Sequence, residues 1–234
     1  MRPEYGETWV YESIIGAVPG IDLSERRAIA IQFVGFEAAV LALGWYYDLR
    51  TAAIAGTVAV AVAALGSAEM LKISATARRP ETPDAYRRLL FGSSLEVVLG
   101  VVAFVALVTY LFVFDARSAE PFVETLFGPE PPTAAVFLML LVLWDLCYRI
   151  GTGWWASIVG LWRSVRYRFD TETAATLARA DREVLVFGLL QLPLAAFLTE
   201  QPILFVAVVG HVIAITIVSG ASIALLRSKA EESI

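Results

Sequence analysis

The chain is poor in the residues that most metal and redox sites require. It has one cysteine, Cys147, and one histidine, His211, among its 234 residues. One cysteine excludes an internal disulfide and a cysteine-based metal cluster, and one histidine excludes a multi-histidine metal site. We therefore expect no metal and no cofactor. The fingerprints of nucleotide binding, zinc-dependent hydrolysis and serine nucleophiles are also absent, so the sequence does not favour an enzyme.

Charged residues are few, and lysine is almost missing. Only 18% of residues are charged, the net charge is −5, and sixteen arginines stand beside two lysines. This acidic, lysine-poor composition, rich in alanine and valine, resembles that of halophile or high-GC proteins. The arginines form no exposed stripe with interleaved aromatic residues. We therefore expect no binding to nucleic acid.

Apolar residues make up 58% of the chain, which has a mean hydropathy of +0.69. They occur in long blocks rather than in short alternating runs, as in a polytopic membrane protein. A helix needs about 20 apolar residues to cross a bilayer. Six segments meet this length or approach it, and backbone groups in lipid must bond internally, so we predict an all-α bundle of six transmembrane helices. The segments are residues 28–47, 52–72, 89–114, 133–152, 183–199 and 203–226.

Three regions follow from these segments. Residues 1–27 are expected to form a cytoplasmic segment with a short amphipathic helix in the membrane interface. Residues 28–226 form the transmembrane domain, and residues 227–234 form a cytoplasmic tail. The N-terminus lacks the basic-then-apolar order of a signal peptide, so we expect it to remain on the protein.

Basic residues alternate between the connecting segments. The N-terminal segment, the two long connections around residues 72–88 and 163–182, and the tail carry nearly all of them. The other connections hold only Arg50 and Arg117. Arginine and lysine are enriched on the cytoplasmic side of membrane proteins. We therefore expect a protein of the cell membrane with both termini and the two long connections in the cytoplasm. A helix is expected to start near Asp170 and to continue into the fifth segment.

The odd-numbered segments resemble one another. Glu37, Glu96 and Gln191 each place an acid or amide on an apolar helix, with an arginine upstream. Three tandem helical hairpins would produce this pattern, and internal repeats are common in transporters. Apolar segments with arginine at each edge also resemble one another by chance. Separately, residues 52–72 are nearly all small, which predicts a helix that its neighbours approach closely, either at the centre of the bundle or at a contact between copies of the chain. An alanine-rich genome is the alternative explanation.

Polar residues inside the segments gather at two depths. At about 1.5 Å per helical residue, Glu37 and His211 fall near the bilayer midplane, with Asp145 and Gln191 slightly further in. A second layer lies nearer the cytoplasm. It contains Gln32, Glu69, Glu96 and Arg149. For Glu69 and Glu96, basic neighbours favour a role as interface anchors.

Asp145 and Arg149 are four residues apart, so both side chains share one helix face and can pair. One interpretation is a self-neutralised pair that fixes helix packing. The other is an ion or proton relay. Arg149 can also extend toward the headgroups.

Glu37 has no basic residue one turn away, so it must be protonated or find a partner on another helix. His211 has matching depth, and a Glu37–His211 pair would switch its protonation near neutral pH. The alternative for Glu37 is a hydrogen bond to a hydroxyl or carbonyl group as a packing device. For His211 alone, a packing role is favoured over metal ligation.

The stretch GTGWW at residues 151–155 predicts that the fourth segment ends there and that the following residues lie along the inner membrane surface. One alternative is a helix that unwinds at the two glycines around Thr152, as in discontinuous transporter helices. Another is a straight helix that continues to Arg163.

Two classes of function remain. The first is a small channel or secondary transporter for a proton or inorganic ion, with Glu37, Asp145 and His211 as its site and Arg149 tuning Asp145. The second is an accessory, assembly or sensory membrane subunit that acts through its basic cytoplasmic connections. A membrane enzyme acting on lipids is a third, less favoured class. The partners expected are the lipid bilayer, and a second copy of the chain or another protein.

Overall fold

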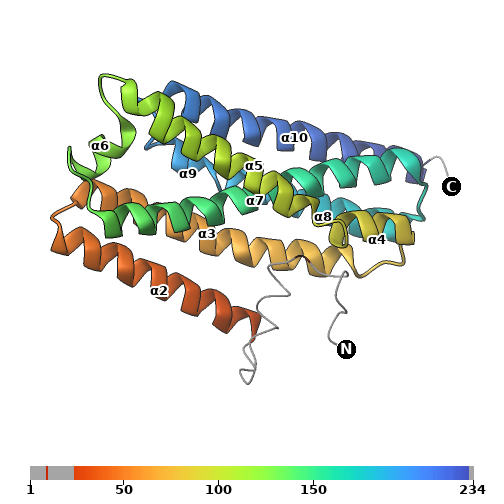
Figure 1. The fold of residues 1–234 in the computed structure, drawn as a ribbon. Helices are drawn as coiled ribbons and strands as arrows, with labels where there is room; N and C mark the ends of the chain where they lie inside the picture. Colours follow the sequence, from red (N-terminus) through yellow and green to blue (C-terminus); the bar gives the residue numbers. More distant parts are fainter. Residues whose placement is uncertain (1–8, 10–23, 232–234) are drawn as a thin grey trace.

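The computed structural model describes Trp9 and residues 24–231, and the regular structure of this part is entirely helical (Figure 1). Five stretches are long and apolar enough to cross a membrane. The all-α membrane bundle is therefore confirmed. The stretches are α2 (Glu25–Tyr46), α3 (Arg50–Ala77), α4 (Asp84–Phe91) with α5 (Leu95–Thr109) and its continuation to Arg117, α7 (Thr133–Arg166) and α10 (Pro202–Glu231).

The count of six spanning helices is not confirmed, because the predicted fifth helix is broken. α8 (Thr171–Leu189) ends well before residue 199, and only the short α9 (Leu192–Ala195) follows it. Pro193 lies in that short helix. Proline has no backbone N–H to donate to the preceding turn, and its ring clashes with a carbonyl group of that turn, so a continuous helix is interrupted here. α8 itself is polar at its start and apolar only toward its end, so it is not among the membrane-crossing helices.

The predicted start of α8 is confirmed. The Asp170 carboxylate accepts hydrogen bonds from the backbone N–H groups of Thr173 and Glu172, each at 3.0 Å. These bonds, with Thr173 the larger contributor, hold the pKa of Asp170 below its ordinary value.

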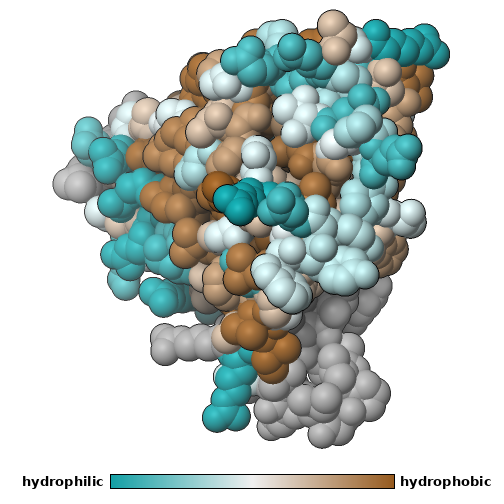
Figure 2. All heavy atoms as spheres, turned by 90° about the vertical axis from the view of Figure 1, so that its left-hand side faces the viewer, coloured by the Kyte–Doolittle hydropathy of each residue, from teal (hydrophilic) through white to brown (hydrophobic). Residues whose placement is uncertain are grey.

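Figure 1 shows the two ends of the bundle, and the residues that they carry differ in charge. The basic end is formed by α4, the start of α8 and the last turns of α3, α7 and α10. It carries Arg78, Arg87, Arg166, Arg179 and Lys229. The acidic end is formed by the short α6 (Phe122–Phe127) and the connections on either side of α9. It carries Asp115, Glu120, Glu124, Glu130 and Glu200, and hydrophilic side chains are spread over it among apolar ones (Figure 2).

Long helices that follow one another in the chain pack together: α2 with α3, α5 with α7, and α8 with α10. This agrees with three hairpins, although the shorter α8 makes the third pair unlike the other two. α3 contacts α7 and α8 as well as α2. The central position predicted from its small residues is therefore confirmed.

The predicted break at residues 151–155 is wrong, because α7 runs unbroken from Thr133 to Arg166. Its glycines serve helix packing instead of unwinding. A Cβ at Gly151 would lie 2.5 Å from the backbone nitrogen of Gly100 and 2.6 Å from the carbonyl oxygen of Glu96. Only glycine allows α5 and α7 to approach this closely.

The predicted interfacial helix lies outside the described residues, except for Trp9. That side chain is fully buried, its indole N–H donates to the carbonyl oxygen of Leu90 at 2.9 Å, and its ring lies 5.5 Å from that of Phe91. Trp9 therefore packs on the end of α4 and does not face lipid headgroups.

The contact between α5 and α7 leads to a stability prediction. Gly151→Ala places its methyl group against backbone atoms that cannot move aside, so we expect a loss of about 1–3 kcal/mol. Thermal unfolding in detergent measures it. Gly210→Ala is the matched control, since a Cβ there meets nothing within 4 Å. Equal midpoints for the two variants would contradict the close approach.

Candidate functional site

Asp145 and Arg149 form the predicted pair. Arg149 Nη2 lies 2.8 Å from both Asp145 carboxylate oxygens, and its Nε lies 3.2 Å from Oδ2. Arg149 is only 2% exposed, and its Nη1 lies 3.6 Å from Met70 Sδ on α3. The guanidinium is therefore directed into the bundle and not toward headgroups. A bidentate pair of this kind fixes the geometry of both side chains.

Glu37 bonds to a neighbouring helix, as its packing alternative anticipated. Thr57 on α3 donates from Oγ1 to Glu37 Oε1 at 2.8 Å, whereas Oε2 is buried without a hydrogen bond. The bond links the spans α2 and α3.

The predicted Glu37–His211 pair is not formed. Neither ring nitrogen of His211 has a hydrogen-bond partner among the described residues, and the ring instead meets Trp154 edge-on at 5.9 Å. His211 and Asp145 also line different hollows: Asp145 borders a narrow crevice that it shares with Gln32 of α2, whereas His211 lines a large cavity. Equal depth in the membrane therefore does not bring these groups together.

The remaining predicted residues also lie apart. Glu69 accepts a hydrogen bond from Lys72 Nζ at 3.0 Å, in agreement with an anchor near the surface. Glu96 is fully buried in the first turn of α5, so it is not an exposed anchor. Gln191 is buried at the junction of α8 and α9, and its side-chain nitrogen has no hydrogen-bond partner among the described residues.

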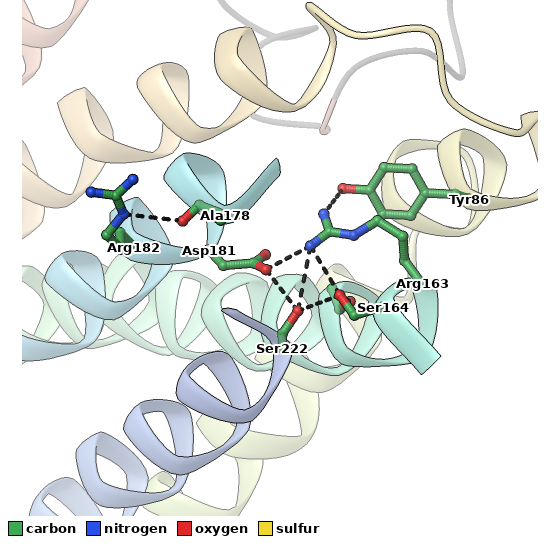
Figure 3. A network of polar contacts seen from close by, with 8 residues as sticks. Tyr86, Arg163, Ser164, Ala178, Asp181, Arg182 and Ser222 are labelled. Carbon is green, nitrogen blue, oxygen red and sulfur yellow. Dashed lines mark hydrogen bonds and ion pairs between the residues drawn. The ribbon is translucent and has the colours of Figure 1, made fainter. Parts of the chain in front are cut away.

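A buried ion pair that the sequence reading missed lies near the basic end (Figure 3). Arg163 Nη2 of α7 lies 2.6 Å from Asp181 Oδ2 of α8. Arg163 Nη1 donates to the Tyr86 hydroxyl of α4 at 2.9 Å, and the Ser222 hydroxyl of α10 donates to Asp181 Oδ2 at 2.6 Å. Four helices therefore meet at one guanidinium–carboxylate contact.

Further contacts close this network. The hydroxyl oxygens of Ser164 and Ser222 are 2.7 Å apart, and Lys229 Nζ donates to the carbonyl oxygens of Ser164 and Val165, each at 2.7 Å. A Cβ at Gly160 would lie 2.8 Å from Asp181 Oδ1, so this glycine makes room for the carboxylate.

One sequence signal could have revealed Arg163. It lies two heptads after Arg149, so both project from the same side of a continuous helix. The predicted break at residues 151–155 placed Arg163 on the membrane surface and hid this relation.

A large cavity lies in the acidic half of the bundle, within the described part of the chain. Its volume is about 520 Å³, and α2, α3, α5, α6, α7, α9 and α10 all contribute to its lining. α8 ends at Leu189 and does not reach this half of the bundle. Between α8 and α10, only the short α9 and the connection after it lie here. The missing length of α8 accounts for the space.

The lining of this cavity is apolar and uncharged. Alanine, leucine, valine and phenylalanine predominate, and among the described residues no Asp, Glu, Lys or Arg side chain takes part. The groups able to hydrogen-bond are Tyr110, Cys147, Trp154 and His211. Ala106 of α5 and Ala207 and Ile203 of α10 line the cavity and are exposed, so it opens to the surroundings on this side.

Polar contacts hold the acidic end of the cavity together. The Tyr110 hydroxyl donates to Gln201 Oε1 at 3.3 Å, and Gln201 Nε2 donates to the carbonyl oxygen of Glu120 at 3.3 Å. The backbone N–H of Phe122 donates to Asp115 Oδ2 at 2.6 Å. Tyr110 begins a π-helical turn, Tyr110–Phe114, and such turns are frequent at functional sites.

No group of three or more His, Cys, Asp or Glu side chains within Trp9 and residues 24–231 is arranged to hold a metal ion. The fold and these sites define a polytopic helical membrane protein in which Arg149 and Arg163 are paired with aspartates inside the bundle, and in which a large cavity is lined by apolar residues. Residues 4–222 match the family model described as "Family of unknown function (DUF7530)", so the chain belongs to that family. No curated protein and no solved structure matches the chain.

The buried pair yields a second stability prediction. Removing one partner leaves an uncompensated charge inside the bundle, so Asp181→Asn and Arg163→Met should each cost about 3–5 kcal/mol. The double variant should lose less than the two single losses added together. Thermal unfolding in detergent gives all three values. Arg50→Gln is the control, because its pair with Asp48 is exposed and contributes about 0–1 kcal/mol. Additive losses would contradict a coupled pair.

Proposed function

We propose that this membrane protein takes an apolar ligand from the bilayer and binds it within the acidic half of the bundle. The observation that carries the proposal is the uncharged cavity of about 520 Å³. Its volume lies within the range of small-molecule sites, roughly 300–1,000 Å³. An empty space of this size would forfeit dispersion contacts along its whole lining, so an occupant stabilises the bundle.

Access from the bilayer suits such a ligand. Ala106 and Ala207 belong to helices long and apolar enough to cross the membrane, and both line the cavity and are exposed. A ligand that enters between α5 and α10 stays in an apolar environment throughout. The chain needs no hydrated path for this function.

The expected ion pathway has lost its geometric basis. Glu37 is bonded to Thr57, Asp145 is bonded to Arg149, and His211 is among the residues that line an uncharged cavity. An ion route requires polar groups that follow one another along one path. These three residues do not share one path, so proton or ion transport stays a prediction from the sequence that their arrangement does not support.

The second candidate is an accessory, assembly or sensory membrane subunit. The ion pairs of Arg149 with Asp145 and of Arg163 with Asp181 favour it. Charges that are neutralised inside the bundle fix helix packing and leave the basic end to meet a partner. For either function, we propose that the protein lies in the cell membrane. We also propose that the basic end of the bundle lies in the cytoplasm, because arginine and lysine are concentrated at that end.

Blocking the cavity tests the proposed function. Ala106→Phe combined with Ala207→Phe adds two rings to the lining at the open side, so we expect bound ligand to fall by roughly tenfold. Mass spectrometry of protein purified from its native membrane would quantify the hydrophobic compound that remains bound after detergent exchange. The control pair is Ala38→Phe with Ala221→Phe, two exposed positions outside the lining.

Two results would overturn this function. One is a wild-type protein that retains no compound and takes up no added apolar compound. The other is equal retention by the blocked variant and the control pair.

A further inference from the structure

We propose that the ligand is an amphiphile whose apolar chain fills the cavity while its head group, which carries no negative charge, stays at the opening near the acidic end. The class comprises chain lipids with an uncharged or positively charged head group. This inference rests on the proposed function, since it names the class of ligand that the same cavity takes. It assigns the selection of the head group to carboxylates beside the opening.

The opening lies between α5 and α10. Both helices pack on α7, but within the described part of the chain they do not pack extensively on each other. Ala106, Ile203 and Ala207 line the cavity along this gap and are exposed. At its acidic end the gap is bridged by the hydrogen bond from the Tyr110 hydroxyl to Gln201 Oε1, at 3.3 Å. An apolar chain can therefore pass between α5 and α10 just inside this contact.

The opening is shallow, whereas the cavity extends deep into the bundle. Ile203 and Ala207 lie one and five residues into α10, which begins at Pro202 at the acidic end. At about 1.5 Å per residue they lie roughly 2 and 8 Å along the helix. His211 of the same lining lies roughly 14 Å along it, beside Trp154. An amphiphile keeps its head group at the membrane surface, so its chain points from the opening toward Trp154.

Carboxylates lie beside the opening on its acidic side. Gln201, which spans the gap, also donates from Nε2 to the carbonyl oxygen of Glu120 at 3.3 Å, and its chain neighbour is Glu200. Glu120 and Glu200 are exposed, and neither has an ion pair with any described residue. Arg117 can offset one of these charges, but the exposed Glu124 of α6 adds another carboxylate. A negative potential therefore surrounds the position of the head group.

The interior of the cavity gives an anion no support either. Among the described residues that line it there is no Arg or Lys, so a carboxylate or phosphate drawn inward would lose its hydration without a counter-charge. At the opening, the same anion would be repelled by Glu120 and Glu200 within a Debye length, about 10 Å at 0.1 M salt. Fatty acids and acidic phospholipids are thus disfavoured in both places. Uncharged head groups meet neither cost, and the carboxylates attract cationic ones.

The test compares three probes with the same chain and a fixed head charge: hexadecanol, hexadecyl sulfate and hexadecyltrimethylammonium. Each competes with isotope-labelled hexadecanol for the purified full-length protein in nanodiscs of zwitterionic lipid, and binding is corrected for uptake by empty nanodiscs. At about 0.1 M salt we expect the sulfate to bind roughly three- to tenfold more weakly than hexadecanol, and the ammonium probe at least as tightly. At about 1 M salt, where the Debye length falls to roughly 3 Å, the three affinities should converge. Discrimination that persists at the higher salt concentration would contradict selection by charge.

A charge variant at the opening separates this selection from packing. Glu120→Gln combined with Glu200→Gln removes both carboxylates and leaves the lining unchanged, so the sulfate should approach hexadecanol in affinity at low salt. The matched control is Glu81→Gln with Glu172→Gln, an equal change of charge at the basic end, and it should keep the discrimination of the wild type. Retained hexadecanol binding shows that each variant is folded.

Two photoreactive analogues of hexadecanol test the orientation of the ligand. One carries a diazirine next to the hydroxyl group, and the other carries it at the far end of the chain. Peptide mass spectrometry should place the first crosslink near Ala106 or Ile203 and the second near Ile150 or Trp154, which also line the cavity. The reverse assignment would overturn the position of the head group at the opening.

The outcomes also distinguish this inference from the proposed function. If the wild type binds all three probes equally at low salt, or if the variant of Glu120 and Glu200 discriminates as the control does, selection by these carboxylates is refuted and the cavity function stands. Tightest binding of the sulfate overturns the class of head group. If no probe binds, the proposed function fails as well.

Discussion

The ion pair between Arg163 and Asp181 is the contact on which the arrangement of this bundle depends. In an apolar interior a charge persists only with a close partner and satisfied hydrogen bonds. Here the guanidinium and carboxylate lie 2.6 Å apart, and Tyr86 and Ser222 supply further bonds. Because these residues come from α4, α7, α8 and α10, the pair holds all four helices together near the basic end.

This anchorage explains why the two halves of the molecule differ. Asp181 lies in the polar part of α8, and its ion pair with Arg163 attaches this part of α8 to α7. α8 then ends at Leu189, shortly before Pro193. Beyond that point, no full-length helix fills the position between α3, α7 and α10. The basic half is therefore closed by ion pairs, whereas the acidic half contains the apolar cavity with His211 in its lining. Packing therefore depends on contacts in the basic half, whereas the proposed ligand binding belongs to the acidic half.

Properties that vary along the chain could be predicted from the sequence. Block hydrophobicity predicted the α2, α3, α5, α7 and α10 spans, and spacing within one helix predicted the Asp145–Arg149 pair. Small residues predicted the central place of α3. Each of these features depends on local composition or on a single helix, which is why it could be recognised without coordinates.

Features that depend on the relative rotation of helices could not be predicted in this way. The similar depths of Glu37 and His211 in the membrane predicted that the two side chains would pair. In the structure Glu37 contacts Thr57 of α3, whereas His211 contacts Trp154 of α7. Gly151 led to the prediction of a helix break. In the structure it allows the close approach of α5 instead, and the sequence does not distinguish these two roles of glycine. The cavity left no signal, since it results from the absence of side chains between helices.

The most direct measurement is an experimental density map of the protein in native-lipid nanodiscs. It should contain elongated density inside the bundle, bounded by α5, α7 and α10, within the cavity that the apolar side chains line. A cavity collapsed by inward movement of α9, or a continuous file of water reaching both ends, would contradict the assignment of this space to an apolar ligand.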